Sequence, residues 1–334
     1  MDSNTKKGLI FGTIGVFLVG LQPVIANSRP SIIDPYIFAA ITALIEAIIF
    51  LPLYYFERKK LLSIGETNPG KNKNLNSLLN GWKKPENIML LIVIGLAFSF
   101  IPILLYIGYE LAGATNSTII LKGEIIFALL FGFLILNEKV TKIQLLFCFI
   151  LFFGLIFTIT LGFSNLVKLN IGVLILIVSV ALFTFIHTLT KVRFDKNELF
   201  PTQLIFIRNF MSGILLLVIY IILFPLENLK IIFDPNNFIF FLLMGFDYGF
   251  SLYFWYKTLT FIQIGTATII NSLTPFSTAF FAYIILGDAF TIFHLIGIVI
   301  IMFSIIMIVR EKENKVNREQ LVAVHEIDKE YKEK

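Results

Sequence analysis

The sequence predicts an all-α membrane protein with ten transmembrane helices in two inverted five-helix repeats. Three observations lead to this fold class. Hydrophobic residues make up 57% of the chain and charged residues only 15%, whereas a soluble protein has about 25% charged residues. Ten apolar runs are long enough to cross a bilayer, and the two halves align on each other at an offset of 150 residues, or near 166 for the second helix with the seventh. A soluble fold is disfavoured because there is too little polar side chain to cover the apolar ones.

Each helix is predicted from an apolar run of about 17–25 residues, the length that spans the hydrocarbon core. The first run follows Lys6 and Lys7 and is too long for the hydrophobic part of a signal peptide, so we interpret it as a membrane helix. In chain order, the predicted helices cover residues 8–27, 36–56, 88–109, 114–136, 141–162, 170–190, 201–224, 238–260, 264–286 and 291–309.

The basic residues predict a multi-pass protein of the plasma membrane with both termini in the cytoplasm. With the N-terminus inside, 21 of the 27 Lys and Arg residues fall in cytoplasmic segments, and only Arg29, Lys168 and Lys230 fall outside. Cytoplasmic loops carry such an excess of Lys and Arg. The basic loop 57–87 and the charged tail 311–334 are therefore expected inside, where basic residues next to helix ends also favour anionic membrane lipids.

The internal repeat divides the membrane part into residues 1–165 and 166–310. Five helices are an odd number, so the second repeat enters the membrane from the opposite side. Inverted repeats recur in secondary transporters, whose substrate site lies near the midplane where the repeats meet. At the offset of 150, the matching pairs include Gly95 with Gly245, Tyr106 with Tyr256, Thr118 with Thr268, and Glu138 with Asp288.

Two segments, KGEIIFALLFGFLILNEKVT (122–141) and LTPFSTAFFAYIILGDAFT (273–291), carry related motifs. They resemble the two copies of the signature of the drug/metabolite transporter superfamily, EamA type. That signature has a proline, a run of small and aromatic apolar residues, and then Gly-acid-x-x-Thr. The second copy keeps Pro275, Gly287, Asp288 and Thr291; the first keeps Glu138 and Thr141, with Ile125 and Asn137 where the proline and glycine would stand.

The resemblance implies the drug/metabolite transporter fold, in which two inverted bundles of five helices enclose a central cavity. The first, third, fourth, sixth, eighth and ninth helices would surround this cavity, and the fifth and tenth would lie at the periphery. It also implies that the substrate is a metabolite or a drug, and that transport is often outward.

Four ionisable side chains are predicted near the membrane midplane: Glu46, Lys122, Glu124 and Asp247. Such a residue costs about 2.5–3.5 kcal/mol and normally faces a polar cavity or a partner. On one regular helix, Lys122 and Glu124 would point about 200° apart. We favour Lys122 as the cation that faces the ligand and Glu124 as a group that binds another helix, although the sequence leaves this choice open. Asp247 is either a ligand contact or protonatable group, or the partner of Lys122 or Arg208. Glu46 is expected to pair with a buried base.

Other polar groups complete the predicted site. Arg208 could bind an anion or contact a helix end, and His187 is interpreted as a satisfied histidine rather than a proton relay. Pro275 removes one backbone donor and so frees the carbonyl of Asn271 for a ligand or water. The predicted substrate-binding set is Lys122, Asp247, Asn271, Thr274, Tyr106, Tyr256 and Arg208, and the set for coupling or charge pairing is Glu124, Glu46 and His187.

These features favour a secondary transporter that moves a small polar or amphipathic metabolite by alternating access, with export as the expected direction. One of the carboxylates could carry a coupled proton. We expect a monomer or a homodimer, with no cofactor, metal or nucleic acid. The alternatives are a non-transporting sensor or scaffold with the same fold, and a passive channel or lipid scramblase. An enzyme is disfavoured because the chain has one cysteine and three histidines and lacks H-E-x-x-H, G-x-S-x-G and C-x-x-C motifs.

Overall fold

The computed structural model describes residues 3–67, 72–137, 140–164, 170–196, 198–261 and 264–311. These residues contain ten spans that are long and apolar enough to cross a membrane. The predicted fold class and number of spans are therefore confirmed. Two spans, the fourth and the ninth, are each broken near the middle into two shorter helices, which the sequence interpretation did not predict.

The first half of the chain contains α1 (Ser3–Ser28), α2 (Pro35–Thr67), α3 (Asn72–Asn80), η2 (Gly81–Lys83), α4 (Pro85–Ala112), α5 (Ala114–Leu121), α6 (Glu124–Leu136) and α7 (Lys142–Ile159). The second half contains α8 (Ile171–Asp195), α9 (Pro201–Leu223), η4 (Leu226–Phe233), α10 (Pro235–Phe261), α11 (Ile264–Asn271) and α12 (Thr274–Leu286). A final membrane helix covers Ile292–Glu311.

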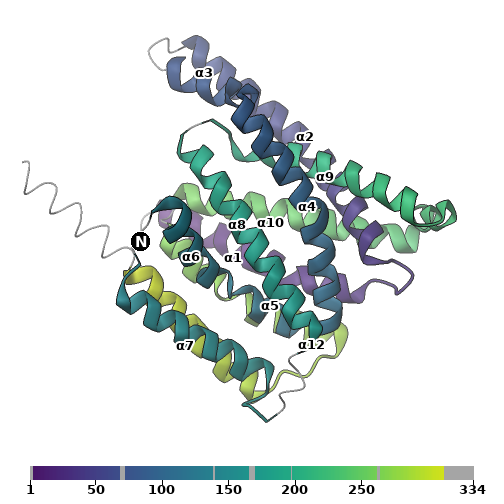
Figure 1. Cartoon of the computed structure of the whole chain (residues 1–334), viewed down its shortest axis with the longest axis vertical. Helices are drawn as coiled ribbons and strands as arrows, with labels where there is room; N and C mark the ends of the chain where they lie inside the picture. Colours follow the sequence, from purple (N-terminus) through teal and green to yellow (C-terminus); the bar gives the residue numbers. More distant parts are fainter. Residues whose placement is uncertain are drawn as a thin grey trace, which may run out of the picture.

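The two repeats interlock helix by helix (Figure 1). Helix α1 packs against α10 and α12, and its counterpart α8 packs against α4 and α6. Helix α2 packs against its own counterpart, α9. The first helix of each repeat thus packs against the third and fourth spans of the other repeat. An inverted repeat has this property, because each half completes the packing surface of the other.

Helix α7 and the final helix form a separate pair at the edge of the bundle (Figure 1), in the peripheral place that the resemblance implies. Gly154 lies against Ile300, and a Cβ on Gly297 would meet the side chain of Thr158. Glycines at the contact allow the two backbones to approach closely. The threonine of the signature starts α7: Thr141 Oγ1 accepts from the backbone N–H of Gln144, and Gln144 Oε1 accepts from the backbone N–H of Thr141. It is an N-cap.

The breaks in the two interrupted spans occur at equivalent positions. Helix α5 ends at Leu121 and α11 at Asn271, and the following helices begin at Glu124 and Thr274. Helices α6 and α12 end in left-handed caps, at Asn137 (φ 53°) and Gly287 (φ 72°). Asparagine tolerates this conformation better than most residues do. It can therefore replace the glycine of the signature in the first repeat.

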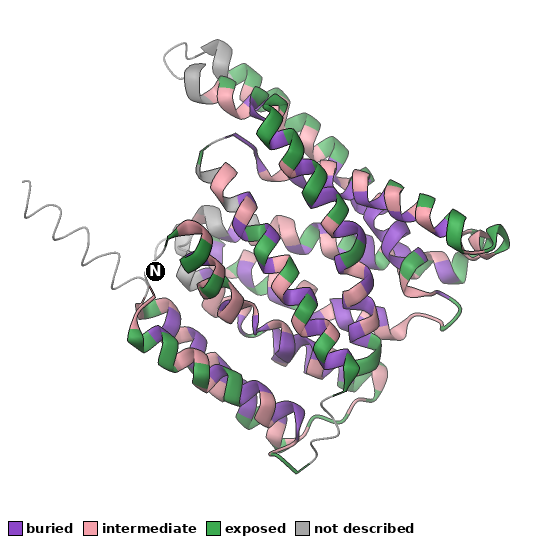
Figure 2. Ribbon diagram, viewed as in Figure 1, coloured by how far each residue is buried: buried purple, intermediate pink, exposed green. Residues whose placement is uncertain are grey.

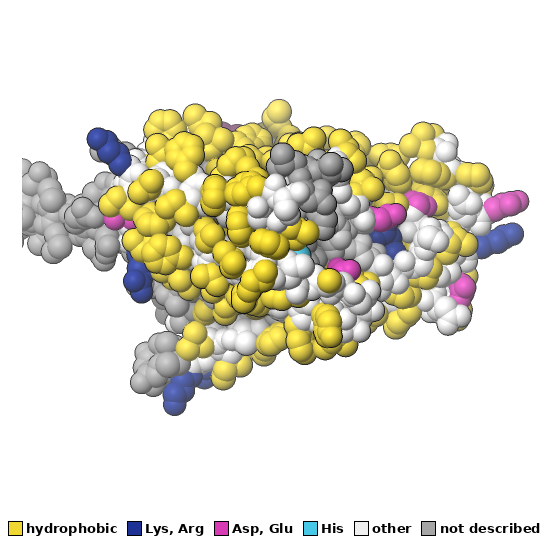
Figure 3. Space-filling view, turned by 90° about the horizontal axis from the view of Figure 1, so that it is seen from below, with side chains coloured by type: hydrophobic (Ala, Val, Ile, Leu, Met, Phe, Trp, Pro, Cys, Tyr) yellow, Lys and Arg dark blue, Asp and Glu magenta, His cyan; other side chains and the backbone are white. Residues whose placement is uncertain are grey.

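Buried residues concentrate between the helices, while the outward faces are exposed and largely hydrophobic (Figure 2). In Figure 3, the side chains on one face are mainly hydrophobic, and the charged ones lie mostly toward its two ends. Lipid tails would cover such a surface. The buried charged side chains are few among the described residues, and they define the candidate site.

Candidate functional site

Lys122 lies at the break of the first repeat and reaches across to the break of the second. Its Nζ donates to the backbone carbonyl of Asn271 at 3.0 Å. The same carbonyl accepts from Thr274 Oγ1 at 2.6 Å, and it lacks its helical donor because Pro275 has no N–H. The sequence predicts that this carbonyl is free to accept from a ligand or water, and in the structure it accepts from these two side chains of the protein instead. The lysine is 4% exposed and lines neither of the two cavities described below.

The break also changes the geometry expected for Glu124. Because α5 and α6 are separate helices, the 200° separation of one continuous helix does not apply. Glu124 is the first residue of α6, and a carboxylate is favourable at the positive end of a helix. Among the described residues its side chain makes no ion pair within 4.0 Å and no hydrogen bond, and the charge it interacts with is that of Lys122, so the expected partner on another helix is not found there.

A cavity of about 160 Å³ lies between α4, α8, α9 and α10. Arg208 and His187, which the sequence separates by 21 positions, both line it. The guanidinium of Arg208 lies 4.2 Å from the centre of the Phe98 ring, and His187 stacks on Phe183 with ring centres 4.1 Å apart. The remaining lining is mostly apolar and consists of Ile94, Phe98, Ile186, Thr190, Leu204, Ile205, Leu252 and Trp255.

Arg208 is balanced by Glu46 from α2, as the sequence predicted for that glutamate. The Nη2 atom lies 3.4 Å from Glu46 Oε1, and Nε donates to Asn209 Oδ1 at 3.0 Å. A guanidinium has five N–H donors. No hydrogen bond from Nη1 forms within the described part of the chain. Arg208 therefore has N–H donors left that could bind another group. Its charge is compensated by the one contact with Glu46, which is long for a hydrogen bond.

Asp247 on α10 lies in a second polar cluster near α1. It is 4% exposed, and neither carboxylate oxygen has a hydrogen-bond partner among the described residues. Gln22 lies beside the carboxylate and interacts with it, while its amide donates to Ser251 Oγ at 3.2 Å. Neither Lys122 nor Arg208 lies within ion-pair distance of it. A buried carboxylate without a donor is costly, so Asp247 is a candidate site for a proton or a ligand.

The tyrosines of the predicted site fall in different places. Tyr106 is buried and packs against Phe38 with ring centres 4.8 Å apart, so it lines neither cavity. The side chain of Tyr256 lies outside the described residues. Trp255, which sequence reasoning did not single out, lines the Arg208 cavity and also a small one of about 20 Å³ between α1, α10 and α11 that reaches Asn271.

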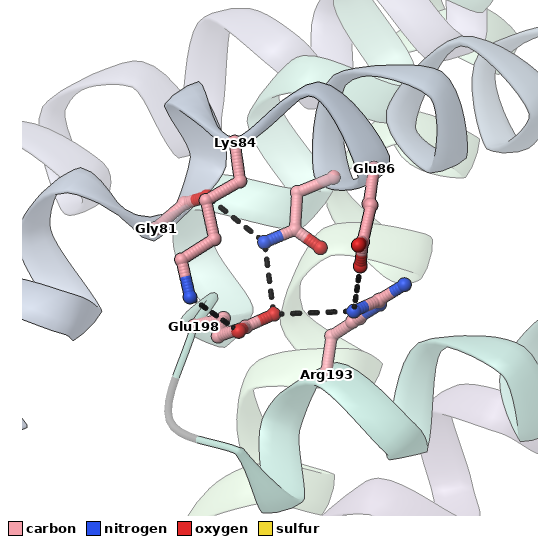
Figure 4. Close-up of polar contacts among 6 residues, drawn as sticks. Gly81, Lys84, Glu86, Arg193 and Glu198 are labelled. Carbon is pink, nitrogen blue, oxygen red and sulfur yellow. Dashed lines mark hydrogen bonds and ion pairs between the residues drawn. The ribbon is translucent and has the colours of Figure 1, made fainter.

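A network centred on Glu198 joins the two repeats beyond the cavity (Figure 4). Glu198 accepts from Lys84 Nζ at 2.6 Å and from Asn87 Nδ2 at 3.0 Å, and Arg193 Nη1 lies 3.4 Å away. Arg193 also contacts Glu86 at 3.1 Å. The hydrogen bonds from Lys84 and Asn87 lower the pKa of Glu198 to about 2.

This network lies at the end of the bundle where α8 ends and α9 begins, which we call the α8–α9 end. Thr190 lines the cavity, and Arg193 is three residues further along α8, about 4.5 Å in helical rise. Sequence analysis counted these charges only toward membrane orientation. The available signal was the presence of acidic residues within both basic loops, in KKPEN (83–87) and in DKNE (195–198), but nothing in the local sequence indicates that the two loops meet.

Comparison with known proteins agrees with this architecture. The model of the EamA-like transporter family matches residues 6–160 and 170–310. An "Uncharacterized transporter" of Methanothermobacter thermautotrophicus (strain Delta H) is 27% identical over 239 residues, covering 68% of this chain and 65% of the relative. The chain thus aligns with a little under two thirds of that relative. A solved crystal structure matches with a TM-score of 0.58 at 13% identity, over 90% of this chain and 96% of the other, which is a likeness in fold.

Proposed function

Because the chain belongs to the EamA-like transporter family, we propose that it is a secondary transporter that moves a small polar or amphipathic metabolite by alternating access. The observation that carries the proposal is the 160 Å³ cavity with Arg208 and His187, enclosed between helices of both repeats. A site at the junction of two inverted repeats can open to either side when one repeat rocks against the other.

The Glu198 network supplies a gate for this movement. Its partners come from the first repeat (Lys84 and Asn87) and from the second (Arg193). Opening the cavity at the α8–α9 end would pull these groups apart. We propose that this end faces the cytoplasm, since basic residues concentrate there, and that the described conformation is closed on that side. Both termini would then also be cytoplasmic, and export is the direction we propose.

The non-transporting alternative differs in one respect: its cavity would stay sealed. Cysteine labelling tests this. Thr190→Cys in a Cys148→Ser background places one thiol in the cavity, because Cys148 is the single natural cysteine. An impermeant maleimide is added to either side of sealed vesicles that contain the protein in one orientation.

A transporter is expected to be labelled from each side. Breaking the Glu198 network should raise the labelling rate from the α8–α9 side and lower the labelling rate from the opposite side. Labelling from neither side, including with Glu198→Gln added, would support the sensor or scaffold. Labelling from both sides together with ion leakage would support a channel.

A further inference from the structure

We infer that the Arg208 cavity binds a small organic monocarboxylate with an apolar body, and that Glu46 releases Arg208 and takes up one proton when the anion binds. This inference rests on the proposed transport function and specifies its substrate class and coupling. It is argued from the lining of the cavity, the free donors of the arginine and the charge balance around Glu46.

The cavity suits a compact apolar group with one acidic end. Its volume of about 160 Å³ is close to the roughly 150 Å³ of an engineered cavity that binds benzene. Seven of the ten lining residues are isoleucine, leucine, phenylalanine or tryptophan, and the others include Arg208 and His187 but no Asp or Glu. A cationic substrate would find no counter-charge there.

Arg208 is held in a position that suits a carboxylate. Its guanidinium lies over the Phe98 ring, 4.2 Å from the ring centre, and Nη1 makes no hydrogen bond within the described part of the chain. A carboxylate can accept two parallel bonds from such a fork. The contact with Glu46 uses one long bond of 3.4 Å, so an incoming carboxylate with two shorter bonds would replace it favourably.

Charge balance then requires a proton. Glu46 is 4% exposed, and an unpaired buried carboxylate is costly. The other ionisable groups near it are Tyr106 from α4 and Tyr248 from α10, while His187 from α8 lies near Arg208. Tyrosine cannot become a cation, and His187 stacks on Phe183 and makes no ion pair with Glu46 among the described residues.

The site is neutral before binding, with one arginine cation and one glutamate anion. After binding it holds the arginine cation, the substrate anion and a protonated Glu46, which is again neutral. The proton comes from water on the open side, and it leaves with the anion when the cavity opens to the other side. Transport is therefore electroneutral, and its direction follows the sum of the acid and proton gradients. Export of an acid that accumulates in the cell fits this scheme.

A binding experiment with three probes of nearly equal shape tests the substrate class. The probes are 3-methylbutanoate, 3-methylbutan-1-ol and 3-methylbutylamine, which differ mainly in charge. The chain has two tryptophans, so Trp82→Phe leaves Trp255 in the cavity wall as the reporter of occupancy. We expect the carboxylate to change the Trp255 fluorescence with saturation and the other two to have no saturable effect. Saturable binding of the amine or the alcohol alone would overturn the inference.

Variants test the exchange with Glu46. Arg208→Gln should remove carboxylate binding, whereas Glu46→Gln should bind at least about tenfold more tightly, because the competing anion is gone, a gain of about 1.4 kcal/mol. A purely structural ion pair predicts weaker binding in both. Between about pH 6 and about pH 8 the probe is ionised, and uptake of one proton makes log Kd rise with pH with a slope approaching one. The slope should be zero in Glu46→Gln. Equal slopes in the two proteins would overturn the proton step.

Two controls keep the outcomes separate. The double variant Glu46→Gln with Arg208→Gln leaves no unpaired buried charge, so loss of binding in it is due to the missing guanidinium and not to an uncompensated charge. Lys230→Gln removes a cation from the exposed η4 surface. Proteoliposome flux then distinguishes this inference from the proposed function. Carboxylate binding without flux would reject transport and leave the binding site standing. Saturable flux of the amine or alcohol without carboxylate binding would leave transport standing and reject the anion site.

Discussion

Removing the charge of Glu198 should open the cavity at the α8–α9 end. The bond from Asn87 is buried, and a hydrogen bond to a charged group contributes about 1.5–3 kcal/mol, of which glutamine would keep about 1 kcal/mol. The Lys84 side chain is 52% exposed, so its ion pair contributes less than about 1 kcal/mol. Glu198→Gln should therefore cost the closed state about 2 kcal/mol, which is roughly a 30-fold shift in the closed–open equilibrium.

The assay is the rate at which an impermeant maleimide labels Thr190→Cys in the Cys148→Ser background, added from the α8–α9 side. Glu198→Gln should raise this rate by roughly 30-fold. Glu86→Gln is the matched control, because Glu86 makes one contact in the same network and its side chain is 74% exposed. It should change the rate by less than about threefold. Equal rates in the two variants, or no change with Glu198→Gln, would refute the assignment of Glu198 as the centre of the gate.

Four further predictions follow from the described contacts. Lys122→Met loses a bond worth about 1.5–3 kcal/mol but also a burial cost of about 2.5–3.5 kcal/mol, so its thermal stability in detergent should stay within about 1.5 kcal/mol of the parent; a loss above about 3 kcal/mol would contradict this balance. The lowered pKa of Glu198, about 2 against an ordinary value of 4.5, stabilises the fold above about pH 4.5, and this contribution is lost as the pH falls toward 2. The Tm difference between the parent and Glu198→Gln should therefore be constant at neutral pH and vanish in acid, whereas a difference that grows in acid would reverse the sign of the argument. Asp247→Asn removes an unpaired buried carboxylate and should raise stability by about 1–2 kcal/mol; lower stability in the same unfolding assay would mean that an ion or ligand held by Asp247 had been lost. Gly297→Ala places a methyl group against Thr158 and should cost about 1–3 kcal/mol, and an unchanged Tm would show that α7 and the final helix can separate freely.

Sequence reasoning identified the correct types of residue for the candidate site but not their contacts. Glu46 was expected to pair with a buried base, and the structure pairs it with Arg208, 162 positions away. Lys122 was favoured as the ligand-facing cation because its neighbours on a regular helix are polar. The helix breaks beside it, and its amino group reaches Asn271 instead. The roles of Lys122, Asp247 and the other candidates in binding stay predictions until they are tested by transport or ligand binding.

The sequence by itself determined the ten membrane spans and the 150-residue offset of the repeats. Both depend on local hydropathy and on the order of side chains along one helix, which a linear pattern records directly. The tertiary structure alone decided which polar groups meet. It brings Lys122 to Asn271, Arg208 to Glu46, and Lys84 and Asn87 to Glu198. The physical reason is that a buried charge or an open carbonyl needs a partner, but many residues could serve, and only the packing of one repeat against the other selects the one that does.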